Sequence, residues 1–179
     1  MPFAYYRRLT RRGQATYRKS DEVPAIAVPG AALLQPAVAM LRQALADDDG
    51  EAVARSAFAV AAGLCRALGV RSPRLEIHAV RPRAATHELH GLYVPEPGDD
   101  GPPAIRVWMR TARKGRVVAF RTFLRTLLHE LVHHLDYELL GLDESFHTEG
   151  FFRRESSLFR QLVPEGDPAG EARRRPERE

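Results

Sequence analysis

The sequence has a single cysteine, Cys65, among its 179 residues. One thiol cannot form an internal disulfide or supply the ligands of a zinc ribbon. It lies in the apolar run AFAVAAGLCRAL, which predicts a buried, inert thiol and fits a reducing compartment. No stretch reaches the roughly 18 apolar residues of a membrane span, and no apolar run follows the charged N-terminal residues as in a secretory signal. The sequence therefore predicts a soluble, cytoplasmic protein with no membrane partner.

Acidic residues are missing from the first 20 positions, which hold six Lys or Arg side chains. Hydrophobic residues nevertheless make up 44% of the chain, enough for one packed core. We expect a basic N-terminal arm over 1–30, one domain over 31–163 and a disordered tail over 164–179, where Pro, Gly and charged residues dominate. Within the arm, the RRG at 11–13 is typical of a turn and suggests a short hairpin.

Apolar residues recur at helical spacing in four stretches and alternate with polar residues in three. The sequence predicts helices over 36–50, 51–69, 118–140 and 150–163, and strands over 74–80, 87–94 and 104–110. Because helices and strands are segregated along the chain, the expected class is α+β, with a small, mostly antiparallel sheet packed against the helices.

The motif HELVH places His129 and His133 four residues apart within the predicted helix 118–140, with Glu130 next to the first histidine. Residues four apart lie on the same face of a helix, so both imidazoles can bind one Zn²⁺. Zinc lowers the pKa of a bound water from 15.7 to about 7, and a neighbouring carboxylate can then take its proton. Since the motif lies mid-helix with apolar flanks, we favour a metal site over a purely structural helix.

A catalytic zinc needs a third protein ligand and one open position. His147 lies 14 residues after His133, beyond the helix stop at Gly141, where a returning chain could bring it beside the first pair. Glu149 is the alternative, because a zinc site of this kind can take a glutamate from the following helix. We favour His147 and leave Glu149 open.

Two further polar residues lie in the same helix. His134 points about 100° away from His133 and cannot bind the same ion, so we interpret it as a surface group or as a group supporting the ligands. Asp136 returns to the face of His129 and His133. It either accepts a hydrogen bond from the second ring nitrogen of a ligand histidine or is a surface carboxylate.

The stretches TLLHELVHHLDY and SFHTEGFFRR resemble the SprT-like zinc metallopeptidases, a branch of the gluzincin-type zincins. The matching positions are His129, Glu130, His133, His147, Gly150 and Phe151/Phe152, within a resemblance that covers roughly 104–163. The glycine after the third histidine is displaced, and the cysteine-rich ribbon that many relatives carry is absent.

The resemblance implies a zincin-like minidomain that hydrolyses peptide bonds of a protein or peptide substrate. Zn²⁺ would be held by His129, His133 and His147, with Glu130 as general base and then general acid. Strand 104–110 would be the edge strand along which a substrate pairs. An oxyanion donor is also needed, and the sequence leaves four residues open: His90, Tyr93, Tyr137 and Arg153.

Residues 104–128 carry seven basic side chains and no acid. Together with the N-terminal arm they could bind nucleic acid, although solvated surface charge is the simpler interpretation. The alternative to a peptidase is therefore a non-enzymatic zinc module that binds nucleic acid or a protein partner. A third, weaker alternative is an unrelated hydrolase of small molecules. The oligomeric state cannot be predicted from these features.

Overall fold

The computed structural model describes residues 3–82, 90–95 and 101–163. Two short 3-10 helices, five α-helices and three strands occur in these ranges. They are η1 (Ala4–Arg8), α1 (Arg11–Asp21), η2 (Ala31–Leu34), α2 (Gln35–Ala46), α3 (Gly50–Ala67), β1 (Arg74–Val80), β2 (Gly91–Val94), β3 (Ala104–Arg110), α4 (Phe120–Glu138) and α5 (Glu149–Leu162). The α+β class is therefore confirmed.

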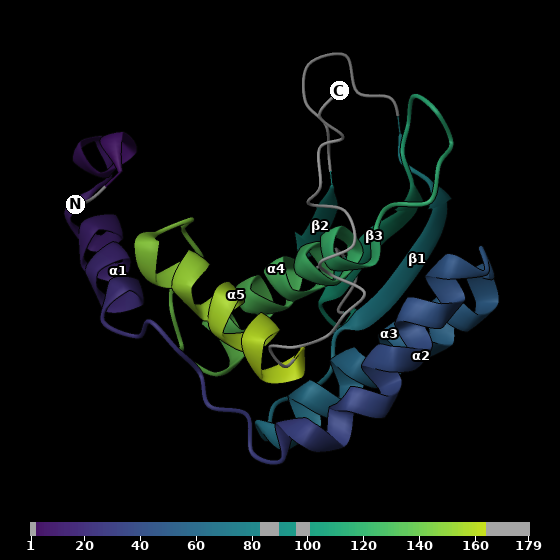
Figure 1. Ribbon diagram of the computed structural model, residues 1–179. Helices are drawn as coiled ribbons and strands as arrows, with labels where there is room; N and C mark the ends of the chain where they lie inside the picture. Colours follow the sequence, from purple (N-terminus) through teal and green to yellow (C-terminus); the bar gives the residue numbers. More distant parts are fainter. Residues whose placement is uncertain (1–2, 83–89, 96–100, 164–179) are drawn as a thin grey trace, which may run out of the picture.

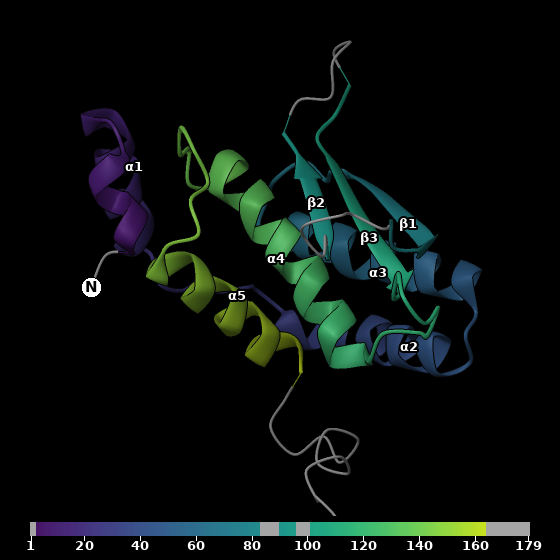
Figure 2. The same cartoon turned by 90° about the horizontal axis from the view of Figure 1, so that it is seen from above.

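Helix α4 is the central element of the fold (Figure 1). Seen from above, it lies between α5 and the strands, and α1 lies on the far side of α5 (Figure 2). Its buried face consists of Phe123, Leu124, Leu127, Leu128, Leu131, Val132 and Leu135. The helix stops before Gly141, whose φ of 56° is left-handed and suits a residue without a side chain. Because α4 is held on several sides, residues on its one open face are fixed in position.

The sheet is mixed, with strand order β1-β3-β2. Strand β3 pairs in parallel with β1, placing Ile77 beside Val107, and in antiparallel with β2, placing Gly91 beside Val107. The expectations of a mostly antiparallel sheet and of an edge position for strand 104–110 are therefore wrong. All three segments alternate in the same way, and alternation specifies which face is buried but not which strand is central. The edge strand beside α4 is β2.

The predicted alternation is confirmed for β3 and in part for β1, where Ala79 is exposed. Leu75 and Ile77 of β1 and Ile105, Val107 and Met109 of β3 join one core with α3 and α4. On the opposite face, Arg106 donates to Glu76 on the neighbouring strand at 2.9 Å. Only residues 91–94 of the predicted strand 87–94 form β2, while residues 83–89 lie outside the described ranges.

The N-terminal segment is folded against the domain. Thr10 caps α1 by accepting from the N–H of Gly13 at 3.1 Å, so the RRG triplet forms the first helical turn and the hairpin prediction is wrong. Tyr17 of α1 is only 1% exposed. A Cβ on Gly150 would lie 2.3 Å from the carbonyl oxygen of Ser20, so α1 and α5 approach closely only because glycine occupies this position.

Three further predictions concern the cysteine, the C-terminal tail and membrane spans. Cys65 is fully buried, as predicted, and burial raises the pKa of its thiol to about 11. The predicted disordered tail, 164–179, lies outside the described residues. Among the described helices, none has the length and apolar character needed to cross a membrane.

Candidate metal centre

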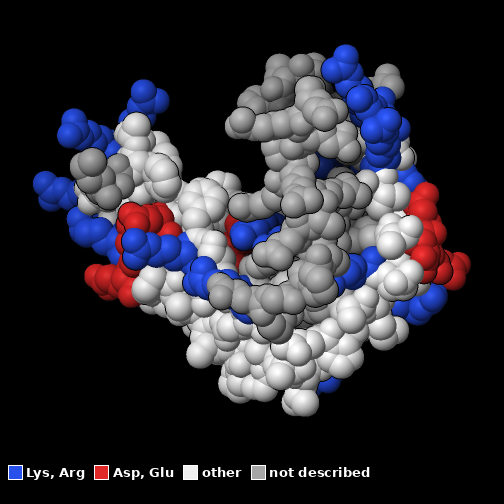
Figure 3. Space-filling model, viewed as in Figure 1, with Lys and Arg blue, Asp and Glu red and all other residues white. Residues whose placement is uncertain are grey.

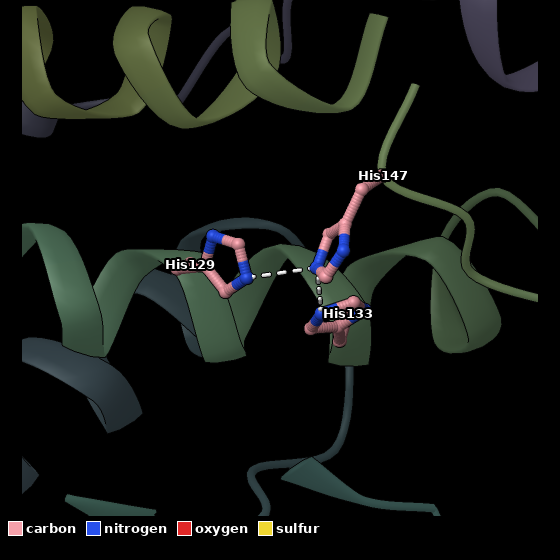
Figure 4. Close-up of side chains that lie close together, drawn as sticks. All are labelled: His129, His133 and His147. Atoms are coloured by element: carbon pink, nitrogen blue, oxygen red, sulfur yellow. Dashed lines mark hydrogen bonds between the residues drawn. The ribbon is translucent and has the colours of Figure 1, made fainter. Parts of the chain in front are cut away.

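Three imidazole rings converge at the open face of α4 (Figure 4). His129 and His133 project from successive turns of the helix, and His147 reaches them from the segment between α4 and α5. The Nε2 atom of His147 lies 2.9 Å from Nε2 of His129 and 3.0 Å from Nε2 of His133. These three residues form a cluster whose ligand atoms all lie within 4.8 Å of one another.

The outer ring nitrogens fix the tautomers of the first two histidines. Nδ1 of His129 lies 3.2 Å from a carboxylate oxygen of Glu155, which can only accept a hydrogen bond. Nδ1 of His133 lies 2.7 Å from Oγ of Ser145, whose own proton is donated to Asp136 at 2.7 Å. Both Nδ1 atoms must therefore carry the proton, which leaves both Nε2 atoms with free lone pairs.

These lone pairs point toward the same small volume as Nε2 of His147. One proton on His147 can satisfy only one of the two facing nitrogens, so the cluster is incompletely paired without a cation. Zn–N bonds of about 2.05 Å in a tetrahedral site place two nitrogens about 3.3 Å apart, which is close to the 2.9 and 3.0 Å that separate Nε2 of His147 from the other two rings. The donor set fits Zn²⁺, which accepts neutral imidazole nitrogens.

Burial favours the neutral form of His133 and His147. It lowers the pKa of His133 to about 3, with further lowering by His129 and His147. Burial also lowers the pKa of His147, and the charge of His129 adds to this effect. Because a metal binds only deprotonated imidazole, the lowered pKa values of His133 and His147 lower the cost of metal binding.

Glu130 lies between the metal-ligand cluster and β2. Its side chain is 6% exposed, and its carboxylate accepts from the backbone N–H of Tyr93. Burial raises the pKa of Glu130 to about 7, against the lowering effects of His129 and of that N–H. A carboxylate with a pKa near 7 can both take and return a proton at neutral pH.

The cluster and Glu130 line a cleft of about 650 Å³. Its wall on the sheet side is formed by the edge strand, through Gly91, Leu92 and Tyr93. The alternative ligand, Glu149, is exposed at the first turn of α5, where its carboxylate binds Arg153 at 2.5 Å. The structure therefore brings together His129, His133 and His147, and it directs Glu149 to another partner.

His134 and Asp136 are both fully buried. Neither residue is therefore a surface group, which was one of the two interpretations of each. His134 Nε2 contacts the carbonyl oxygen of Arg71 at 2.7 Å, and its Nδ1 lies 3.2 Å from the hydroxyl of Tyr93. The ring of Tyr93 in turn stacks on His133, with centroids 6.3 Å apart. His134 thus fixes a residue that packs against the cluster, and Asp136 reaches His133 only through Ser145.

Three of the four residues considered as oxyanion donors line the cleft, namely His90, Tyr93 and Tyr137. The hydroxyl of Tyr93 is directed to His134. The hydroxyl of Tyr137 accepts from the backbone N–H of Ser145 at 3.4 Å and keeps its own proton for donation. Arg153 does not line the cleft and is paired with Glu149. Tyr137 therefore has a hydroxyl proton available beside the cleft, and His90 also lines the cleft.

Sequence reasoning missed Glu155 and Ser145, the partners of the first two histidines. A metal-binding imidazole needs an acceptor for its other nitrogen, so an acidic or hydroxyl side chain was to be expected. However, four carboxylates, Asp143, Glu144, Glu149 and Glu155, follow α4 at similar distances along the chain, and spacing alone does not select among them.

Comparison of the chain with protein-family models, curated proteins and solved structures gives no match.

Proposed function

We propose that the protein is a zinc-dependent metallopeptidase with a zincin-like arrangement, in which His129, His133 and His147 bind the metal. The observation that carries this proposal is the convergence of three imidazole Nε2 atoms on one cleft that also contains Glu130. A structural zinc site is closed by four protein ligands, whereas three ligands facing a cleft leave one position for water.

Zinc at this site would supply a water of lowered pKa and polarise the carbonyl of the substrate. Glu130 takes the proton of the attacking water and returns it to the leaving amine. Its pKa of about 7, raised by burial, suits both transfers. Tyr137 or His90 donates a hydrogen bond to the oxyanion that forms on the carbonyl oxygen.

The position of β2 favours a peptide substrate over a compact small molecule. Among the described residues β2 pairs only with β3, and its residues line the cleft. A free strand edge provides backbone donors and acceptors for an extended peptide. The Glu130 carboxylate contacts the N–H of Tyr93, so this edge lies beside the residue that performs proton transfer.

The nucleic-acid alternative has weaker support. Of the basic residues in 104–128, Arg106, Arg110 and Arg125 pair with carboxylates, and Arg121 lies over the ring of Phe159. On the face shown in Figure 3, Lys and Arg gather mainly over α1 and near the loop that follows β3, at opposite sides of the view. A binding-only protein also gives no reason for Glu130 in the cleft.

We further propose a cytoplasmic location, because the only cysteine is an unpaired buried thiol.

The test compares Glu130→Gln, His147→Ala and the control His78→Ala, a histidine on β1 that stacks on Trp108. Zinc per chain is measured after dialysis, and hydrolysis is followed on an unstructured protein substrate. The wild type and His78→Ala should each hold one zinc and be active. Glu130→Gln should retain zinc and lose hydrolysis by a factor of about 10² to 10⁴, whereas His147→Ala should lose zinc.

Equal hydrolysis by Glu130→Gln would refute the mechanism. If His147→Ala still held one zinc per chain, the role of third ligand would be assigned to Glu149 instead. Binding of DNA or RNA that is unchanged in Glu130→Gln, with no hydrolysis in the wild type, would favour the non-enzymatic alternative.

A further inference from the structure

The N-terminal segment contacts the loop that carries His147. This loop, residues 139–148, has no helix or strand of its own, and its histidine is exposed. The hydroxyl of Tyr5 donates to the carbonyl oxygen of His147 at 2.8 Å. One residue further, the hydroxyl of Thr148 meets that of Ser20 at 3.0 Å in a buried contact. The backbone of the third histidine is therefore held by residues more than 120 positions away in sequence.

The loop and the start of α5 are held at additional points. Asp21 accepts from the N–H of Gly150 at 2.7 Å, and Arg12 forms a two-point contact with Asp143 at 2.7 and 2.9 Å. The Arg12–Asp143 pair is exposed, with 79% and 48% of the two side chains accessible, so it contributes little. The buried and backbone contacts near His147 and Thr148 provide most of the attachment.

A second connection runs from α1 to His133 through buried side chains. Arg154 donates to the carbonyl oxygens of Ser20 and Val23, each at 2.6 Å, and to Asp136 at 2.8 Å. Asp136 accepts from Ser145, which accepts from Nδ1 of His133. Each hydrogen bond in this connection is 2.6 to 2.8 Å long. The C-terminal end of α1 is thus tied to the tautomer and orientation of a second ring in the cluster.

We propose that residues 3–21 are a positioning part of the metal centre, so that docking of this segment and zinc binding stabilise each other. The inference rests on the proposed function only in requiring that the cluster binds zinc. Tyr5 acts on His147 through its backbone, and Arg154 acts on His133 through Asp136 and Ser145. Neither touches the metal or the reacting atoms.

Binding linkage makes this proposal reciprocal. If undocking of the segment weakens zinc binding by some factor, zinc must favour the docked state by the same factor. A segment that only completed the fold at a distance would change global stability without a specific change in zinc affinity. The two cases therefore differ in a measurable quantity that does not involve hydrolysis.

Two tyrosines of η1 provide a matched pair of variants. Tyr5 and Tyr6 are both partly buried, and both pack edge-on against Tyr17, with centroids 5.9 and 5.0 Å apart. The hydroxyl of Tyr6 accepts from Arg18 and has no contact with the loop among the hydrogen bonds described. Tyr5→Phe and Tyr6→Phe each remove one hydroxyl and keep the ring, so only the first removes the contact with His147.

Zinc affinity is measured by competition with a chromophoric chelator for the full chain and both variants. Tyr5→Phe should bind zinc about tenfold more weakly, the low end of the loss seen when a group supporting a metal ligand is removed. Tyr6→Phe should bind within about twofold of the wild type, since it leaves every contact with the loop intact. Equal affinities for the two variants would overturn the role assigned to Tyr5.

Hydrogen exchange in the wild type provides an independent measurement. Amides of α1 should exchange more slowly with saturating zinc than after removal of zinc, because the metal opposes undocking. Identical exchange of α1 amides in both states would overturn the coupling. A wild type that binds no zinc would overturn the proposed function as well. A zinc-binding, hydrolytic wild type with equal variants and unchanged α1 exchange would overturn this inference alone.

Discussion

Gly91 lies where the edge strand approaches Glu130, and its replacement by alanine tests the contact between them. A Cβ at position 91 would lie 2.4 Å from Oε1, 2.7 Å from Cγ and 2.8 Å from Cδ of Glu130. Ordinary contact requires about 3.4 Å, so the carboxylate or the strand must move by about 1 Å. Glu130 accepts from the N–H of Tyr93, so a displacement of its carboxylate would disturb this hydrogen bond.

We expect Gly91→Ala to lower the free energy of unfolding by about 1 to 3 kcal/mol, the usual cost of overpacking a buried site. A shift of about 1 Å in the catalytic carboxylate should lower kcat/KM by about 10². Zinc affinity should change by less than about threefold, because all three of the nearest atoms belong to Glu130 and none to a histidine. Urea unfolding, peptide hydrolysis and a zinc titration measure these quantities.

The double variant Gly91→Ala, Glu130→Asp provides the control. Shortening the acid by one methylene makes room for the new methyl group, so the double variant should regain stability without regaining activity. Gly91→Ala with unchanged kcat/KM and unchanged unfolding would show that Glu130 does not pack against β2 as described. A Gly91→Ala protein with weakened zinc binding and unchanged kcat/KM would contradict the conclusion that the added methyl group meets Glu130 and none of the three histidines.

Three further outcomes are expected. Arg154→Met should destabilise the chain by about 3 to 5 kcal/mol in urea unfolding, because it leaves Asp136 buried without its cation, and adding Asp136→Leu should restore much of the loss. Gly150→Ala should lower the unfolding temperature measurably, because its Cβ meets the Ser20 carbonyl at 2.3 Å; an unchanged temperature would contradict this packing. Cys65 should react with a thiol reagent only after denaturation, because burial raises its pKa to about 11.

Local periodicity determined the elements around the centre. Apolar spacing predicted α4, and a separation of four residues placed His129 and His133 on one face of it, as the structure has them. Helix geometry is set by bonds between near neighbours in sequence, so a short stretch is sufficient to specify it. The same reasoning predicted the buried faces of β1 and β3 and the stop at Gly141.

Local periodicity did not predict the order of the strands or the position of the N-terminal segment. The sequence indicates which side chains of 104–110 are buried, but not that this strand lies between the other two. The basic composition of the first 20 residues predicted a basic N-terminal arm but not how it docks, and in the structure α1 buries Tyr17 and packs closely at Gly150. Composition describes the exposed face of such a helix, and a few buried contacts decide where it docks.

The sequence by itself determined a helix that carries two histidines four residues apart, with a glutamate next to the first, and two candidates for the third ligand. Only the tertiary structure brought His147 to that helix and supplied Glu155 and Ser145 as partners of the first two histidines. The reason is physical. Spacing along one helix follows from backbone geometry, whereas the meeting of distant segments depends on packing and on long-range hydrogen bonds that no local pattern specifies.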